Sequence, residues 1–165
     1  MMSSKNKRDF RNIIKNVIET DKFKELKDEF RHGSTRYEHS LRVAKITYRC
    51  TKALKLDYKS ATKAALLHDF YFDSDFGGLS MNKLLTHASI ALKNAKTTYD
   101  LNKKEENIIA SHMFPLCLVS PKYIESWIVS TIDKFVALYE GYRFNLSLIF
   151  SVWTIFLFNM ITIQR

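Results

Sequence analysis

The stretch of sequence that decides the fold runs Ala61-Thr62-Lys63-Ala64-Ala65-Leu66-Leu67-His68-Asp69. It is an apolar helical run that ends in a histidine and an aspartate side by side. Because neighbours on a helix point about 100° apart, these two side chains can hold one metal ion only from adjacent edges of its coordination sphere. Any further ligands of such an ion must come from distant parts of the chain.

Candidate ligands lie on both sides of this pair, each in a segment with helical periodicity: His39, His87, His112 and Asp133. Imidazole nitrogen together with carboxylate oxygen suits divalent iron, manganese or zinc. A single histidine in an apolar helix is more often a partly buried side chain bonded to a backbone carbonyl. Four histidines in separate helices, with two aspartates beside them, favour a shared ion, because burying so many titratable groups without a common partner is costly.

Hydrophobic periodicity divides the chain into about seven helices, so the expected fold class is all-α, a helical bundle with a further hydrophobic C-terminal helix. Helices are expected over residues 8–19, 21–30, 35–54, 57–69, from 80 onward, over 103–113 and from 120 onward. Thr35 with Glu38, and Asn102 with Glu105, have the spacing of a capping box. Pro121 is expected in the first turn of the seventh helix.

Apolar stripes indicate which faces of the expected helices are buried. The stripe of the second helix consists of Phe23, Leu26 and Phe30. The stripe of the seventh helix consists of Ile124, Trp127, Ile128, Thr131, Ile132 and Phe135. Asp133 lies at the edge of this second stripe, where its carboxylate is expected to point at a central ion.

The chain is expected to comprise N-terminal helices over 1–30, a main domain over 31–143 and a hydrophobic C-terminal helix over 144–165. Residues 144–163 carry no charge, and a helix of this length matches a bilayer crossing. Polar residues within the segment weaken that signal. A membrane anchor, a helix packed on the domain or on a second chain, and an unrelated replacement of the usual terminus all stay open.

The formal net charge of +9 favours anionic partners, although a plain solvated basic surface explains it equally well. Phosphorylated small molecules fit this charge, and the absence of a ladder of aromatic and basic residues argues against a dedicated nucleic-acid platform. Cys50 and Cys117 are far apart in the sequence and are expected to be reduced core thiols. That use of cysteine predicts a cytoplasmic protein, anchored to the membrane if 144–163 enters lipid.

The order of His39, His68-Asp69, His87, His112 and Asp133 resembles the HD-domain metal-dependent phosphohydrolases. The resemblance covers roughly residues 30–140 and extends to local context. The matching segments are Arg31-His32-Gly33, Tyr37-Glu38-His39-Ser40-Leu41-Arg42-Val43-Ala44, Leu66-Leu67-His68-Asp69, Thr86-His87 and His112-Met113-Phe114-Pro115-Leu116. In that superfamily one histidine, the His-Asp pair and a distant aspartate hold one ion, and two further histidines accompany a second ion.

The resemblance therefore implies two divalent ions, with iron or manganese expected first and zinc or magnesium as alternatives. The first ion would be held by His39, His68, Asp69 and Asp133. The second would be held by His87 and His112, with Asp69 bridging. Four further residues are candidates to contact substrate: Lys134, Arg36 and Arg42 as cations, and His32 as a substrate contact or general acid.

The implied activity is hydrolysis of a phosphate ester or anhydride, with a nucleotide as the expected substrate class and metal-activated water as the nucleophile. A dinucleoside polyphosphate hydrolase and a non-catalytic metal or nucleotide sensor are the alternatives. The irregular stretch 70–79 follows the His-Asp pair directly and is expected to border the mouth of the site. A homodimer is compatible with the sequence.

Overall fold

The structure is a computed structural model that describes residues 2–31, 33–76 and 83–163, and their side chains except those of residues 31, 83, 84 and 147–163. Its elements are α1 (Ser4–Ile18), α2 (Asp21–Lys24), η1 (Glu25–Lys27), β1 (Phe30–Arg31), β2 (Ser34–Thr35), α3 (Arg36–Ala53), α4 (Tyr58–Leu67), η2 (Asp73–Phe76), α5 (Lys83–Thr98), α6 (Lys103–Ser111) and α7 (Ile124–Ile163). Within these residues the only sheet is the two-stranded hairpin β1–β2. The all-α fold class is confirmed.

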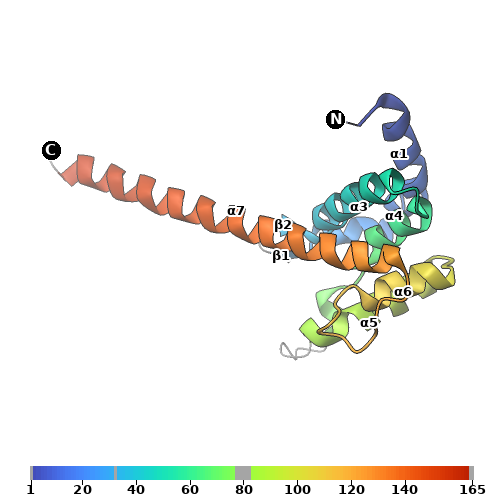
Figure 1. Ribbon diagram of the computed structural model, residues 1–165. Coiled ribbons are helices and arrows are strands. Elements are labelled where there is room, and N and C mark those ends of the chain that lie inside the picture. Colours follow the sequence, from blue (N-terminus) through green and yellow to red (C-terminus); the bar gives the residue numbers. More distant parts are fainter. Residues whose placement is uncertain (1, 32, 77–82, 164–165) are drawn as a thin grey trace.

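Helix α4 lies at the centre of the bundle. It packs against α1, α3, α6 and α7, and α6 in turn packs against α5 and α7 (Figure 1). The small residues Ala61, Ala64 and Ala65 are fully buried and allow these neighbours to approach closely, while Leu66 and Leu67 fill the space between them. Each buried leucine contributes about 1.5–3 kcal/mol relative to an exposed one. The apolar run before the His-Asp pair is therefore the core of the protein.

Two capping boxes begin the helices on either side of α4. At the start of α3 the Thr35 hydroxyl accepts from the Glu38 amide, and the Glu38 carboxylate accepts from the Thr35 amide. Asn102 and Glu105 make the same reciprocal pair at the start of α6. Both predicted boxes are confirmed. They determine where α3 and α6 begin, and so the positions of the histidines that these helices carry.

The N-terminal helices differ from the prediction at their ends. α1 begins at Ser4 rather than at residue 8, because the Ser3 side chain accepts a hydrogen bond from the Asn6 amide and caps the helix. The predicted helix over 21–30 is wrong beyond Lys27, since the chain then enters the hairpin in which Phe30 pairs with Thr35. Phe30 is 78% exposed and is not part of a buried stripe.

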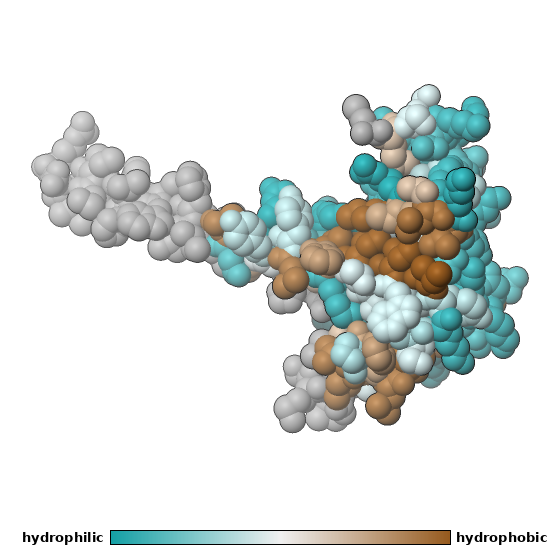
Figure 2. All heavy atoms as spheres, viewed as in Figure 1, coloured by the Kyte–Doolittle hydropathy of each residue, from teal (hydrophilic) through white to brown (hydrophobic). Residues whose placement is uncertain are grey.

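The predicted inner face of the seventh helix is wrong except at Ile128 and Ile132, which are half-buried. α7 begins at Ile124, three residues after Pro121. Trp127 is 51% exposed and Phe135 is 68% exposed, and Figure 2 shows apolar surface over the part of α7 that lies against the bundle. The face that packs inward consists of Glu125, Ser126, Val129, Ser130, Asp133 and Val136. The apolar residues of the predicted stripe do share one face of α7, but the face that is turned inward is the one that carries most of the polar residues.

The proposed boundary at 143/144 falls inside α7, which continues as one helix to Ile163 and projects away from the bundle (Figure 1). Among the residues that the structure describes, no helix combines the length and the apolar character that a membrane crossing requires. The expectation for 144–163 rests mostly on side chains outside the described set. Cys50 and Cys117 are both free, as expected, but Cys50 is exposed and so is not a core thiol.

The cap of α6 provides a test of this architecture. Replacing Asn102 with alanine removes the acceptor for the Glu105 amide, so we expect the free energy of unfolding to fall by about 0.5–2 kcal/mol. The matched control is Asn12→Ala, the same substitution at an exposed position inside α1, where alanine favours the helix. Urea denaturation followed by circular dichroism measures both. Equal stability of the two variants would contradict the capping role.

Candidate metal centre

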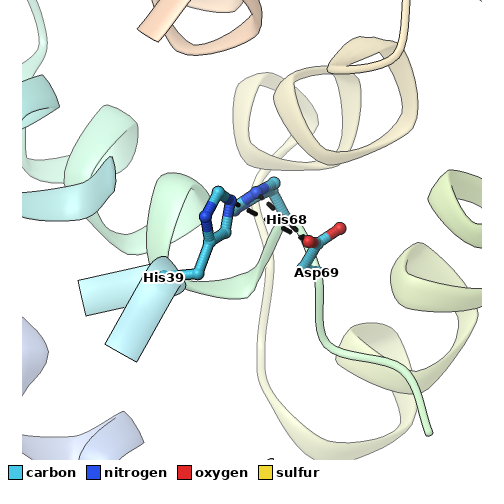
Figure 3. Close-up of side chains that lie close together, drawn as sticks. All are labelled: His39, His68 and Asp69. Atoms are coloured by element: carbon cyan, nitrogen blue, oxygen red, sulfur yellow. Dashed lines mark ion pairs between the residues drawn. The ribbon is translucent and has the colours of Figure 1, made fainter. Parts of the chain in front are cut away.

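The His-Asp pair lies where α4 ends. His68 is the C-cap residue of this helix and Asp69 follows it, and their side chains are 0% and 1% exposed. His39, in the first turn of α3, points toward the same place, as Figure 3 shows. The end of the central helix thus directs both members of the pair into the interior, next to a histidine from a neighbouring helix.

The other predicted ligands converge on this point. His112 is the C-cap residue of α6, His87 lies in α5 and Asp133 lies in α7. All three are buried, with 0%, 2% and 8% of the residue exposed. The structure therefore brings together all six residues that sequence analysis named as metal ligands, from five different helices or helix ends.

The first group of ligand atoms surrounds one oxygen of Asp69. Its Oδ2 lies 4.0 Å from His39 Nε2 and 3.7 Å from His68 Nε2. Oδ1 of Asp133 lies 3.1 Å from His39 Nε2 and 3.4 Å from His68 Nε2. Two ligands bound at about 2.1 Å to one ion are separated by roughly 3.0–3.4 Å. These four side chains are therefore close to the spacing that a single divalent ion imposes.

The second group surrounds the other oxygen of Asp69. Its Oδ1 lies 3.6 Å from Nε2 of His87 and 3.6 Å from Nε2 of His112. The two Nε2 atoms are themselves 3.1 Å apart. Asp69 thus turns one carboxylate oxygen toward each group of histidines, which is the arrangement of a carboxylate able to bridge two ions. His68, His112 and Asp133 form a further set of neighbouring ligand atoms that connects the two groups.

The histidine tautomers show why a cation fits here. Nδ1 of His68 lies 2.7 Å from the carbonyl oxygen of Ala65, and Nδ1 of His112 lies 2.8 Å from that of Ile109. A carbonyl oxygen can only accept, so each Nδ1 carries a proton, and Nε2 is the nitrogen of each ring that faces the carboxylates and can serve a metal ion. Among the described residues, His68 Nε2 is buried with no hydrogen-bond partner.

The carboxylates in the centre are ionised. Burial by itself would raise the pKa of Asp69, but its electrostatic contacts with His68, His112 and His87 hold the pKa well below its usual range. Burial likewise opposes ionisation of Asp133, and contacts with His39 and His68 outweigh it and lower the pKa. Ring nitrogens and negative charges thus converge among buried side chains, a combination that divalent metal ions stabilise.

A pocket of about 700 Å³ opens next to this cluster. Asp69, His87 and Asp133 reach its floor, and Lys134 lies at its side. The Lys134 ammonium donates to the carbonyl of His112 and to the hydroxyl of Ser130 at 3.0 and 2.7 Å, and burial lowers its pKa. The remaining wall is mostly apolar or uncharged: Met113, Leu116, Ala137, Leu138, Tyr142 and Asn145.

The other predicted substrate contacts are placed differently. Arg36 is buried, pairs with Glu29 and Asp73, and stacks over the ring of Tyr71. Its charge is therefore already matched by two carboxylates, one of them from the stretch expected to border the site. Arg42 pairs with Glu140. His32 lies outside the described residues, as does the part of that stretch from residue 77 onward.

Glu140 is a residue of the centre that sequence analysis did not single out. Its Oε2 lies 2.8 Å from Nδ1 of His39, on the far side of the ring from Asp133. The sequence signal is weak, because Glu140 follows Asp133 by two helical turns and lies in a segment without a distinctive motif. The i, i+7 spacing on one helix face is the observation that could have identified it.

The family model described as HD domain matches residues 36–138, more than half of the chain. That range includes all six clustered residues and ends two residues before Glu140. No curated protein and no solved structure shows a significant match.

The cluster predicts that metal stabilises the fold. Mn²⁺ held by the cluster would bind the folded state in preference to the unfolded chain, so at 100 times the dissociation constant it should add about 2.7 kcal/mol and raise Tm by roughly 5–10 °C over chelated protein. Melting followed by circular dichroism measures this shift. Asp69→Asn is the control, because it weakens a ligand that faces both groups. Identical melting with ion and with chelator in the parent protein would contradict the assignment.

Proposed function

This chain belongs to the HD-domain family, and from that premise we propose that it is a metal-dependent phosphohydrolase that cleaves a phosphate ester or anhydride of a nucleotide. The family supports the reaction class. The observation that carries the proposal for this chain is the position of Asp69, whose two oxygens face two separate groups of histidines. Such a carboxylate can hold two ions side by side.

Divalent ions bound here would supply a water of lowered pKa and would neutralise phosphoryl oxygens. His39, His68 and Asp133 would hold the first ion together with Asp69. His87 and His112 would hold the second with the other Asp69 oxygen. Iron and manganese are the ions we favour, because mixed imidazole and carboxylate ligands suit them, with zinc and magnesium as alternatives.

The chain's own contribution to catalysis is orientation and charge. Lys134 borders the pocket one residue after Asp133, and its ammonium can approach an anionic group without leaving Ser130. It is the substrate cation we favour, since Arg36 and Arg42 are each paired with carboxylates. The apolar side chains of the pocket wall would lower the local dielectric constant around a bound phosphate and so strengthen its electrostatic contacts.

The shape of the pocket supports a nucleotide. A volume of about 700 Å³ accommodates a ligand of that size, and the ring of Tyr142 with the amide of Asn145 offers stacking and hydrogen bonding to a base. A dinucleoside polyphosphate and a metal or nucleotide sensor without turnover remain the alternatives. Chromatographic analysis of the products from a panel of mononucleotides and dinucleoside polyphosphates separates all three, because a dinucleoside polyphosphate is cleaved into two nucleotides without release of inorganic phosphate.

The His68→Ala variant tests the reaction. We expect the parent protein loaded with Mn²⁺ or Fe²⁺ to hydrolyse at least one member of this panel. The variant should lose that activity, because His68 Nε2 faces both Asp69 and Asp133. Its helical content should change little by circular dichroism. Turnover at the parental rate in the variant would exclude the pair from the mechanism, and a metal-loaded parent inert on every substrate would favour the sensor.

Replacing Lys134 with methionine tests the substrate cation. Loss of a charge-assisted contact of about 1.5–3 kcal/mol should lower kcat/KM by roughly 10- to 100-fold. Lys122→Met is the matched control, because Lys122 is an exposed lysine before α7 and is not one of the residues that line the pocket. Steady-state kinetics on the best substrate of the panel measures both variants. An unchanged kcat/KM in Lys134→Met would remove this lysine from the site.

A further inference from the structure

Both ring nitrogens of His39 face carboxylates of the same helix. Nδ1 lies 2.8 Å from Oε2 of Glu140, and Nε2 lies 3.1 Å from Oδ1 of Asp133. Both carboxylates belong to α7, where seven residues make almost two full turns and return the side chain to the same face. α7 therefore holds the ring of His39 between two acidic side chains.

We propose that Glu140 is a positioning residue of the metal centre, which sets the tautomer and the orientation of His39. The inference rests on the proposed function, because it concerns the same ions. An ionised carboxylate can only accept a hydrogen bond, so Nδ1 of His39 carries the proton that it donates to Glu140. The lone pair of Nε2 then points at Asp133 and can serve a metal ion.

The position of His39 in its helix explains why a carboxylate is needed. His68 and His112 follow the last turns of α4 and α6, where backbone carbonyls have no partner within the helix, and their Nδ1 atoms use those of Ala65 and Ile109. His39 lies in the first turn of α3, where the carbonyls are engaged by the helix itself. An acceptor for its Nδ1 must come from another element, and Glu140 supplies it.

Arg42 completes the arrangement. Its guanidinium pairs with Oε1 of Glu140, the oxygen that does not face His39, while the Glu140 side chain is only 10% exposed. A cation next to a buried carboxylate favours the ionised form of that carboxylate. A chain of contacts therefore leads from the surface to the proposed ion: Arg42 pairs with Glu140, and Glu140 accepts from His39. This assigns Arg42 to supporting Glu140 instead of contacting substrate.

The experiment compares metal affinities of full-length Glu140→Gln and parent protein by calorimetric titration with Mn²⁺. The amide keeps the shape of the side chain but loses its charge, and we expect 10- to 100-fold weaker binding. Glu125→Gln is the matched control, because Glu125 is a buried glutamate of the same helix that binds Lys104 and the amide of Asp57. Its Mn²⁺ affinity should equal that of the parent.

The outcomes separate this role from the proposed function. A parent protein that binds no ion overturns both, whereas a parent that binds Mn²⁺ and a Glu140→Gln variant of equal affinity overturn the role of Glu140 alone. A second measurement applies even if the variant unfolds. Long-range nitrogen–proton NMR of the parent with Zn²⁺ should show His39 with its proton on Nδ1, and a proton on Nε2 would overturn the inference.

Discussion

The arrangement of the bundle depends on the convergence of lone pairs and negative charges at one buried point. Nε2 atoms of four histidines and the carboxylates of Asp69 and Asp133 meet there. Nδ1 of His68 and Nδ1 of His112 each donate to a backbone carbonyl, so the Nε2 atom of each ring is left to face this point. Such a cluster is costly in a dry interior without a cation. Because its ligands come from α3, α4, α5, α6 and α7, binding energy at this point is also energy that holds the helices together.

Helix ends are the means by which the chain builds this point. The last turns of α4 and α6 expose carbonyls that orient His68 and His112, so each ring is fixed by its own segment. His39 comes from a first turn and depends on a carboxylate 101 positions along the sequence. The orientation of His68 and His112 is therefore local, because each ring bonds to a carbonyl of its own helix. The orientation of His39 is long-range, because it requires α7 to pack against α3.

The local features of the centre are the ones that can be predicted from the sequence. The His-Asp pair after an apolar run, the capping boxes at Thr35 and Asn102, and the helical setting of the remaining ligands all follow from nearest-neighbour physics. The partnership of Glu140 with His39 does not, because no periodicity relates two residues on different helices. Phe30 was misassigned for a similar reason, since its pairing with Thr35 in the hairpin outweighs the apolar spacing that suggested a helix.

The apolar stripe of α7 is present as the sequence predicts, but most of it faces outward and not toward the core. A helix normally turns its apolar face inward. In α7 the inward face must supply Asp133 and Glu140 to the centre, so Trp127 and Phe135 on the opposite side are left substantially exposed. A helix that serves a buried ionic centre gives up part of its hydrophobic burial, and the ions would have to offset that loss. The outward apolar face of α7 is thus a consequence of the same constraint that brings the histidines together.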